Sequence, residues 1–329
     1  MKLLVTGGLG FIGSNFILKL IKNSDDYEIL NIDAELYGSD HRNLSEIKNS
    51  KKYEFIKGNI TNKKFMEEQI KKCDAVINFA AESFVDRSIS DANPFLVSNI
   101  RGAFTILDII SKENKRMIQI STDEVFGNLS SGTANEDSKF NPSSPYAATK
   151  AAAELLINSY SITYDSNVII TRCTNNYGPR QFLEKLIPKT IALAYNNKKI
   201  PVYGNGLNIR DWIFVEDHCN AIHLVLEKGK SGESYNISAN NEIDNLTVIK
   251  KILEIMNKSE DLIEFVEDRP GHDLRYSMDS NKIMKNLDWK VYSDFDNGLK
   301  TTIDWYLQNP SVLNDITKAL ETTPWKNSN

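Results

Sequence analysis

The chain has 329 residues, of which 41% are hydrophobic and 25% are charged, and its formal net charge is -5. This composition excludes a disordered or collagen-like chain, and the length fits one large α/β unit or two domains. The negative charge argues against a general nucleic-acid surface, and no apolar run approaches the roughly 18 residues of a membrane-spanning helix. With no signal-peptide pattern at the N-terminus, we expect a cytoplasmic protein without nucleic-acid or membrane partners.

Cysteines and histidines show no pattern typical of a disulfide framework or a metal site. The chain has an odd number of cysteines, and they are widely spaced in the sequence, at Cys73, Cys173 and Cys219. The four histidines include no His-x-x-x-His pair that would lie on one helix face. We therefore expect three buried free thiols and no bound metal.

Short apolar runs alternate with helical stretches through the first half of the chain. Strands are predicted over Lys2–Thr6, Glu28–Asp33, Tyr53–Ile56, Ala75–Phe79, Met117–Ser121 and Asn167–Arg172, with an Ala-rich helix over Ala147–Tyr160 before the last of them. Regular alternation of strand and helix is typical of a doubly wound parallel sheet. The sequence therefore predicts a Rossmann-type α/β fold.

Beyond Asn175 the pattern loosens, with turn signals at Gly178, Gly204 and Gly271 and a predicted helix over Leu246–Met256. We predict a dinucleotide-binding domain over 1–174 and a smaller α/β, mainly substrate-binding domain over 175–329. Strand-like segments at 212–215 and 234–237 can rejoin the first sheet, so return segments near 209–239 are assigned to the first domain. Residues 324–329 are expected to form a loose tail.

A glycine-rich turn follows the first predicted strand and opens the first predicted helix. Its pattern is Gly8-x-Gly10-x-x-Gly13, and Asp33 follows 20 residues later at the end of the second strand. Such glycines let a pyrophosphate reach the helix N-terminus, and such an aspartate accepts hydrogen bonds from a ribose. Position and context favour a dinucleotide site over turn glycines with a capping aspartate. The negative Asp33, with no arginine over 34–36, favours NAD over NADP.

Tyr146 and Lys150 lie one helical turn apart in sequence. The same spacing occurs at Tyr53 and Tyr195, but only Tyr146 begins an Ala-rich helix and follows a strand that ends in Ser121-Thr122. A tyrosine base near neutral pH needs its pKa lowered by about 3 units from its usual value. We expect Lys150 and a nicotinamide cation to supply that shift together.

Asp123 and Glu124 follow Thr122 at the end of the fifth predicted strand, where open α/β sheets bind ligands. Two interpretations stay open. The acids either cap a helix or occupy a solvated turn, or they form a desolvated pair whose pKa values are driven apart into one acid and one base.

Together these motifs resemble the extended short-chain dehydrogenase/reductases. Gly7-Gly8-x-Gly10-x-x-Gly13 and Tyr146-x-x-x-Lys150 are typical of that family, and Thr122-Asp123-Glu124-Val125 is similar to its dTDP-glucose 4,6-dehydratase branch. The resemblance continues over nearly the whole chain, through the blocks Ala80–Ser88, Asn175–Pro179, Glu184–Pro188, Gly204–Trp212 and Asp268–Asp273.

The resemblance implies the roles of individual residues. It implies catalytic roles for Thr122, Asp123, Glu124, Tyr146 and Lys150. It implies that NAD contacts Gly7, Gly10, Phe11, Ile12, Gly13, Asp33, Asn59, Ile60, Ala80, Ala81, Ser98, Tyr146, Lys150 and Asn176. It implies that the nucleotide sugar contacts Ser83, Thr122, Asn175, Lys185, Leu186, Pro201, Tyr203, Arg210, Asn245, Arg269, His272 and Tyr276. Lys185, Arg210 and Arg269 suit a diphosphate chemically, although each alone also fits a solvated surface cation.

The implied reaction is removal of water from a nucleoside-diphosphate glucose, dTDP-glucose being favoured, to give the 4-keto-6-deoxy sugar with tightly bound NAD. Asp123 distinguishes this dehydratase branch from its relatives. In the family pattern, 4-epimerases carry small residues at this position, and UDP-glucuronate decarboxylases and GDP-mannose dehydratases carry serine. UDP-glucose as substrate, a 4-epimerase and a redox-sensing Rossmann protein are the alternatives.

The resemblance also implies a homodimer through the helices predicted at Pro94–Ile110 and Ala147–Tyr160. The apolar residues Phe104, Leu107, Ala151, Ala152, Leu155 and Leu156 fit that contact, or equally the chain's own sheet. The sequence departs from the family pattern at Asn59, at Phe84 and in the loop 34–42.

Overall fold

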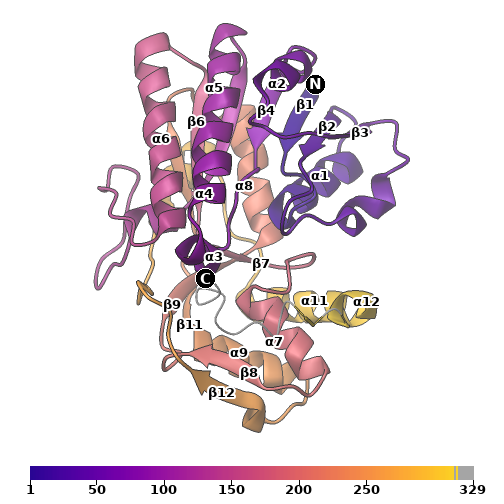
Figure 1. Ribbon diagram of the computed structural model, residues 1–329, viewed down its shortest axis with the longest axis vertical. Coiled ribbons are helices and arrows are strands. Elements are labelled where there is room, and N and C mark those ends of the chain that lie inside the picture. The colour runs from indigo at the N-terminus through magenta and orange to yellow at the C-terminus, as the bar shows by residue number, and fades with distance from the viewer. Residues whose placement is uncertain (315, 318–329) are drawn as a thin grey trace.

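Seven parallel strands form one large sheet in the computed structural model, which describes residues 1–314 and 316–317 (Figure 1). The order is β10-β6-β5-β4-β1-β2-β3, and every neighbouring pair is parallel. The predicted doubly wound sheet is therefore confirmed. The strands are β1 (Lys2–Thr6), β2 (Glu28–Asp33), β3 (Tyr53–Lys57), β4 (Ala75–Asn78), β5 (Arg116–Thr122), β6 (Val168–Cys173) and β10 (Ser234–Ile237).

Alternating side chains of these strands supply two hydrophobic cores. Leu3 and Val5 of β1 face one core, while Leu4 faces the other, as the two-residue period of a strand requires. The first core packs against α1 (Phe11–Asn23), α8 (Val215–Lys228) and α10 (Asn281–Leu287), and the second against α2 (Lys63–Ile70), α5 (Ala103–Lys112) and α6 (Pro145–Tyr164). We call this sheet with its helices the large-sheet half.

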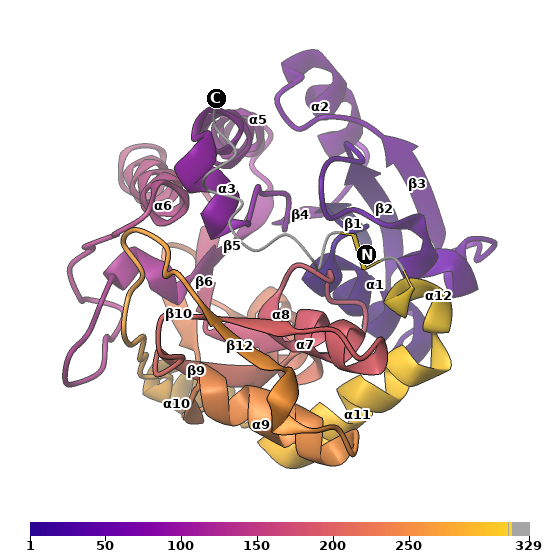
Figure 2. The same ribbon diagram turned by 60° about the horizontal axis from the view of Figure 1, so that its bottom comes forward.

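Two smaller sheets lie below the large sheet in Figure 1 and form what we call the small-sheet half. One contains β7 (Asn175–Tyr177), β9 (Ile209–Phe214) and β11 (Glu242–Asp244), and the other pairs β8 (Ile200–Tyr203) with β12 (Ile263–Val266). Figure 2 shows α9 and α11 on the side of these sheets that faces away from the large one. The helices of this half are α7 (Leu186–Tyr195), α9 (Asn245–Ile255), α11 (Phe295–Gln308) and α12 (Pro310–Leu313).

Short helical segments connect these layers. They are η1 (His41–Ile47), α3 (Val85–Ser90), α4 (Asn93–Phe95), η2 (Leu96–Gly102), η3 (Asp123–Phe126) and η4 (Glu260–Leu262). The predicted helix over 94–110 is a helical run of α4, η2 and α5 whose middle part, η2, is π-helical. None of the described helices is long and apolar enough to cross a membrane.

One expected return to the large sheet does not occur. The segment 234–237 does rejoin it as β10, but the strand containing Trp212 pairs with β7 and β11 instead. β7 begins two residues after β6 and turns away from the large sheet, so β9 aligns with β7 in the small-sheet half. The predicted tail at 324–329 lies outside the described residues.

Candidate active site

The β1–α1 turn brings backbone N–H groups to the carboxyl edge of the large sheet. Gly7 has φ +70°, and a Cβ there would lie 2.6 Å from the Ala80 backbone nitrogen, so the close approach of β1 to the segment after β4 requires glycine. Gly10 is the N-cap of α1 and provides no capping side chain. The first N–H groups of α1 are thus oriented toward an anion at the helix N-terminus.

Asp33 ends β2 beside this turn and is 6% exposed. Its Oδ2 accepts a hydrogen bond from Leu9 N at 3.0 Å, and its Oδ1 accepts bonds from Glu35 N and Ser39 Oγ, both at 2.8 Å. A carboxylate has about four acceptor positions, so the protein already uses most of them. A ribose that bonds both carboxylate oxygens must share one of these positions with Ser39 or Glu35.

Two adjoining cavities run along the carboxyl edge of the large sheet and over the small-sheet half. The first cavity is lined by all fourteen residues expected to contact NAD, together with Ser83, Thr122, Asp123 and Glu124. The second cavity is lined by Leu186, Pro201, Tyr203, Arg210, Asn245, Arg269, His272 and Tyr276. Phe84, Glu124, Asn175 and Lys185 line both cavities and mark where they meet.

Tyr146 and Lys150 enter the first cavity from the start of α6. Ser144 caps this helix by accepting a hydrogen bond from Ala147 N, and Lys150 Nζ donates to the Ile120 carbonyl at 2.6 Å. Burial lowers the pKa of Lys150 to about 8. Burial, followed by the negative charge of Glu124, raises the pKa of Tyr146 well above its usual value. The protein's own groups therefore shift the Tyr146 pKa upward, so the expected lowering depends on the nicotinamide cation.

Asp123 and Glu124 stand in the first turn of η3, with Thr122 as its N-cap. Asp123 is 3% exposed, and Glu124 is partly buried with its Oε2 shielded from solvent, which argues against the solvated-turn interpretation. Burial and then Glu124 raise the pKa of Asp123 to about 8. Burial also raises the pKa of Glu124, while Arg269 and Lys185 act in the opposite direction. Within the described part of the chain, Asp123 Oδ2 and Glu124 Oε2 have no hydrogen-bond partner.

The second cavity gathers cations that are buried rather than solvated. Arg210 is 4% exposed, donates to the Ile209 and Asp273 carbonyls at 2.8 and 2.9 Å, and lies 4.4 Å from the centre of the Tyr276 ring. Lys185 Nζ donates to the Ser83 carbonyl at 2.8 Å and lies 4.6 Å from the Phe84 ring centre. Burial lowers the pKa of the Lys185 and Arg210 side chains. A bound anion would raise both pKa values again, because it favours the charged forms.

His272 faces the same cavity and is paired with an acid. Its Nδ1 lies 2.7 Å from Asp268 Oδ1, and its ring packs edge-on against Tyr203. Burial and the nearby Arg269 lower the pKa of His272 to about 4. His272 is therefore neutral at physiological pH and can serve a ligand by hydrogen bonding, not by charge.

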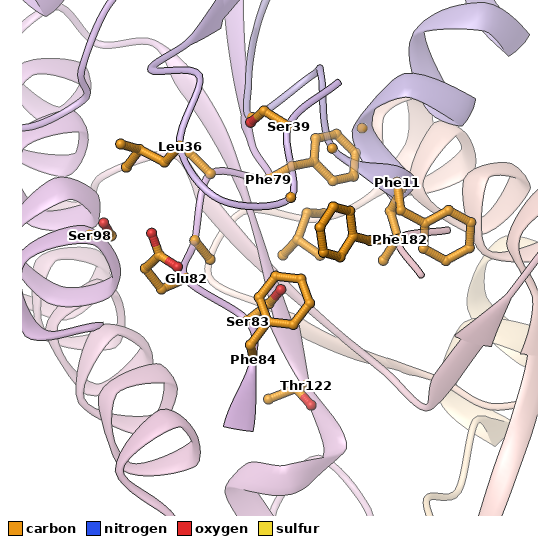
Figure 3. Close-up of a pocket in the computed structure, with 18 of the residues that line it drawn as sticks. Phe11, Leu36, Ser39, Phe79, Glu82, Ser83, Phe84, Ser98, Thr122 and Phe182 are labelled. Carbon is orange, nitrogen blue, oxygen red and sulfur yellow. The ribbon is translucent and has the colours of Figure 1, made fainter. Parts of the chain in front are cut away.

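Aromatic side chains line the first cavity, and among them Tyr37, Phe84 and Phe182 were not predicted as ligand contacts. Figure 3 shows Phe84 beside Ser83, near Thr122, with Phe11 and Phe182 farther along the cavity. The rings of Tyr37, Phe84 and Phe182 pack pairwise at 4.9 to 5.4 Å between centres. Tyr37 and Phe182 come from loops without a periodic pattern, so their position depends on the tertiary fold.

The three cysteines are free and buried, as expected. No group of three or more His, Cys, Asp or Glu side chains among the described residues is placed to hold a metal ion.

Comparison with known proteins agrees with this arrangement. The sequence matches the GDP-mannose 4,6-dehydratase family over residues 4–302. It is 47% identical to the low-salt glycan biosynthesis protein Agl12 of Haloferax volcanii, over 93% of this chain and 99% of the relative. It is 44% identical to the dTDP-glucose 4,6-dehydratase of Haemophilus influenzae, over 94% of this chain and 99% of the relative.

A solved structure shares the whole fold. The crystal structure of DesIV, a dTDP-glucose 4,6-dehydratase from Streptomyces venezuelae with NAD and TYD bound, superposes with a TM-score of 0.93 at 39% identity. The alignment covers 94% of this chain and 98% of that one. The chain therefore belongs to the GDP-mannose 4,6-dehydratase family of NAD-dependent nucleotide-sugar dehydratases and epimerases.

Proposed function

We propose that the protein is a hydro-lyase that converts dTDP-glucose into dTDP-4-keto-6-deoxy-glucose with bound NAD. The pair Asp123 and Glu124 is the observation that carries this proposal, because elimination of water needs one acid and one base at neighbouring carbons. Both acids border the cavity that contains Tyr146, and each retains an oxygen without a hydrogen-bond partner among the described residues.

The first cavity fits NAD on structural grounds. The uncapped start of α1 suits a pyrophosphate, and the glycines at 7 and 13 leave room for close backbone approach. The buried Asp33 suits a ribose and disfavours a 2′-phosphate. When bound, NAD supplies the hydride acceptor for oxidation at C4 and returns the hydride at C6.

The chain's own residues supply the proton transfers. Tyr146 takes the proton of the C4 hydroxyl, while Thr122 and Lys150 stabilise the phenolate. Because its pKa is raised by burial, Tyr146 becomes a competent base only when a positive charge enters the cavity. Glu124 then removes the C5 proton, which the C4 ketone has made acidic, and C5 regains a proton from Glu124, in exchange with solvent, when hydride is returned at C6. Asp123, whose raised pKa of about 8 keeps it protonated, donates to the departing C6 hydroxyl.

The second cavity suits the nucleoside diphosphate. Arg210 and Arg269 provide charge-assisted hydrogen bonds, and Lys185 stands where the two cavities meet. We accordingly propose that residues 1–174, with the returning segment 215–237 that contains α8 and β10, hold the cofactor, and that the remainder, including β9, mainly holds the substrate. Exposed apolar residues on α5 and α6 also support a homodimer.

Turnover assays test this function. Incubation with dTDP-glucose is expected to give a 4-keto-6-deoxy product with deuterium from solvent at C5, whereas UDP-glucose is expected to react more slowly. A single methyl group discriminates by only about 1–3 kcal/mol, so a preference of roughly ten- to hundredfold is expected. A galactose product without a ketone would identify a 4-epimerase and overturn the proposal.

A further inference from the structure

The short helix α3 lies at the junction of the large-sheet and small-sheet halves (Figure 1). Asp86 and Arg87 are adjacent on it, and neither was predicted as a site residue. Successive residues of a helix point about 100° apart, so the two side chains leave α3 in different directions. Asp86 contacts residues of the small-sheet half, whereas Arg87 contacts Tyr37 of the large-sheet half and Glu184 ahead of α7.

Asp86 contacts residues that line the second cavity. Its Oδ1 accepts a hydrogen bond from Arg269 Nη1 at 2.5 Å, and its Oδ2 accepts one from Tyr203 OH at 3.2 Å. The ion pair is largely shielded from solvent, with 15% of the Arg269 side chain and 16% of the Asp86 side chain exposed. Asp86 therefore orients a guanidinium and a phenol that both border this cavity.

Arg87 contacts Tyr37, which lines the first cavity, and Glu184, which lines the second. Its Nη2 donates to Tyr37 OH at 2.6 Å, and its Nε and Nη2 both lie 3.2 Å from Glu184 Oε2. Tyr37 OH donates to the same Glu184 oxygen, and the guanidinium carbon lies 3.8 Å from the centre of the Tyr37 ring. Tyr37 belongs to the loop after β2 and Glu184 to the segment before α7, so Arg87 joins the two.

The depth of these contacts indicates a role beyond surface pairing. The Glu184 side chain is 7% exposed, and a buried carboxylate requires compensating donors. The Tyr37 ring lines the first cavity and packs on Phe84 and Phe182, which line it too. Loss of the guanidinium would allow the loop that contains Tyr37 to move away from the cavity.

We propose that Asp86 and Arg87 are positioning residues with separate tasks. Asp86 holds Arg269 and Tyr203 in place for the diphosphate of the substrate, and Arg87 fastens the Tyr37 loop, which borders the cofactor cavity, to Glu184. The identity of the two ligands rests on the proposed function. The division of tasks rests on the contacts of α3.

Two variants and two binding measurements test this division. Asp86→Asn is expected to raise the Kd for thymidine diphosphate about tenfold while NAD is released at the wild-type rate, within about twofold. Arg87→Met is expected to accelerate NAD release from the purified holoenzyme about tenfold while leaving the Kd for thymidine diphosphate within about twofold. Tyr37→Phe, which keeps the ring but removes the hydroxyl, is expected to accelerate NAD release as well.

Lys251 and Asp296 form an exposed ion pair at 2.8 Å and provide matched controls. Lys251→Gln and Asp296→Asn should change neither the rate of NAD release nor the Kd for thymidine diphosphate. The proposal is overturned if both α3 variants change the same quantity by the same factor, or if neither changes anything. Failure of the wild-type protein to bind NAD or either of two probes, thymidine and uridine diphosphate, would instead overturn the proposed function and the ligands assigned from it.

Discussion

Glu124 is the side chain on which the elimination half of the proposed reaction depends. Oxidation at C4 requires Tyr146 and Lys150, whereas removal of the C5 proton requires a base that acts after the ketone has formed. Glu124→Gln keeps the shape of the side chain but removes the base. We expect hydride transfer without elimination, and a fall in turnover of about 10²–10⁴, the usual cost of losing a general base.

Absorbance provides the measurement for this variant. Added dTDP-glucose is expected to produce bound NADH in stoichiometric amount, with no 4-keto-6-deoxy product and no deuterium at C5. Tyr146→Phe serves as the matched variant and is expected to show neither NADH nor product. Normal turnover by a folded, NAD-bound Glu124→Gln protein would exclude Glu124 as the elimination base.

The raised pKa of Asp123 predicts that kcat depends on pH in the alkaline range. Because its pKa is raised to about 8, the carboxyl is protonated below that pH and able to donate to the leaving hydroxyl. We expect kcat to fall as the pH rises through about 8 and expect Asp123→Asn to lower kcat and abolish this inflection. The same inflection in the Asn variant would assign it to another group.

The raised pKa of Asp123 also affects stability. The folded carboxyl keeps its proton from the usual pKa of 3.8 up to about 8, whereas the unfolded chain has lost it. The contribution of Asp123 to the free energy of unfolding therefore decreases as the pH rises across that window.

Residue types and spacings predicted which side chains line the cavities but not every protonation state. Sequence motifs placed Tyr146, Lys150, Asp123 and Glu124 together because each motif follows a strand of one parallel sheet. The upward shift of the Tyr146 pKa in the protein alone was not predicted, because burial is a property of the assembled fold and the charge of Glu124 acts in the same direction.

At the scale of elements, the β1–α1 turn gives the clearest prediction. Gly7→Ala would place an L-residue at φ +70° and a methyl group 2.6 Å from the Ala80 nitrogen. Gly132 has φ +73°, and a methyl group added there would have no atom within 4 Å, so Gly132→Ala isolates the conformational cost, about 1–2 kcal/mol. We expect Gly7→Ala to lose more unfolding free energy than this control, and to lose bound NAD.

Denaturant unfolding and the NAD content of the purified proteins measure the two effects. Equal destabilisation of the two variants, with full NAD content in both, would show that the turn adapts and that its close approach to Ala80 is not required.

Element order was predictable where buried apolar runs alternate with helices, and less so where a strand has a choice of partners. The apolar run around Trp212 predicts a strand, but its sequence does not specify which strand it pairs with, and in the structure it pairs with β7. The Tyr37–Arg87–Glu184 cluster joins segments 50 and 97 residues apart, with no shared periodic pattern. Such contacts depend on the completed fold.

At the scale of the whole molecule, the two halves jointly build the site. The cavities meet at Phe84 and Glu124 from the large-sheet half and at Asn175 and Lys185 from the segments leading into the small-sheet half. The proposed sugar ring therefore lies where both halves contribute, and the reacting carbons reach Tyr146 only if the halves keep their spacing. α3 is placed to maintain that spacing.

The outer face of α5 and α6 supports the proposed homodimer. Leu107 and Ala151 pack inside the chain, at 0% and 5% exposure, so these two expected contact residues belong to its own cores. Phe104 and Leu155 are 41% and 60% exposed, and Ile162, which lies two turns beyond Leu155 on the same face of α6, is 86% exposed. Apolar side chains gathered on neighbouring helices are typical of a protein interface.

Sedimentation of charge variants tests this face. A stable dimer buries roughly 1,600 Å² in total, and a carboxylate at its centre would be desolvated without a partner. Leu155→Glu is therefore expected to give a folded monomer at micromolar concentration. Leu207→Glu, at a residue 57% exposed between β8 and β9, introduces the same charge away from α5 and α6 and should leave the dimer intact. A monomeric wild-type protein, or dissociation by both variants, would contradict a dimer through these two helices.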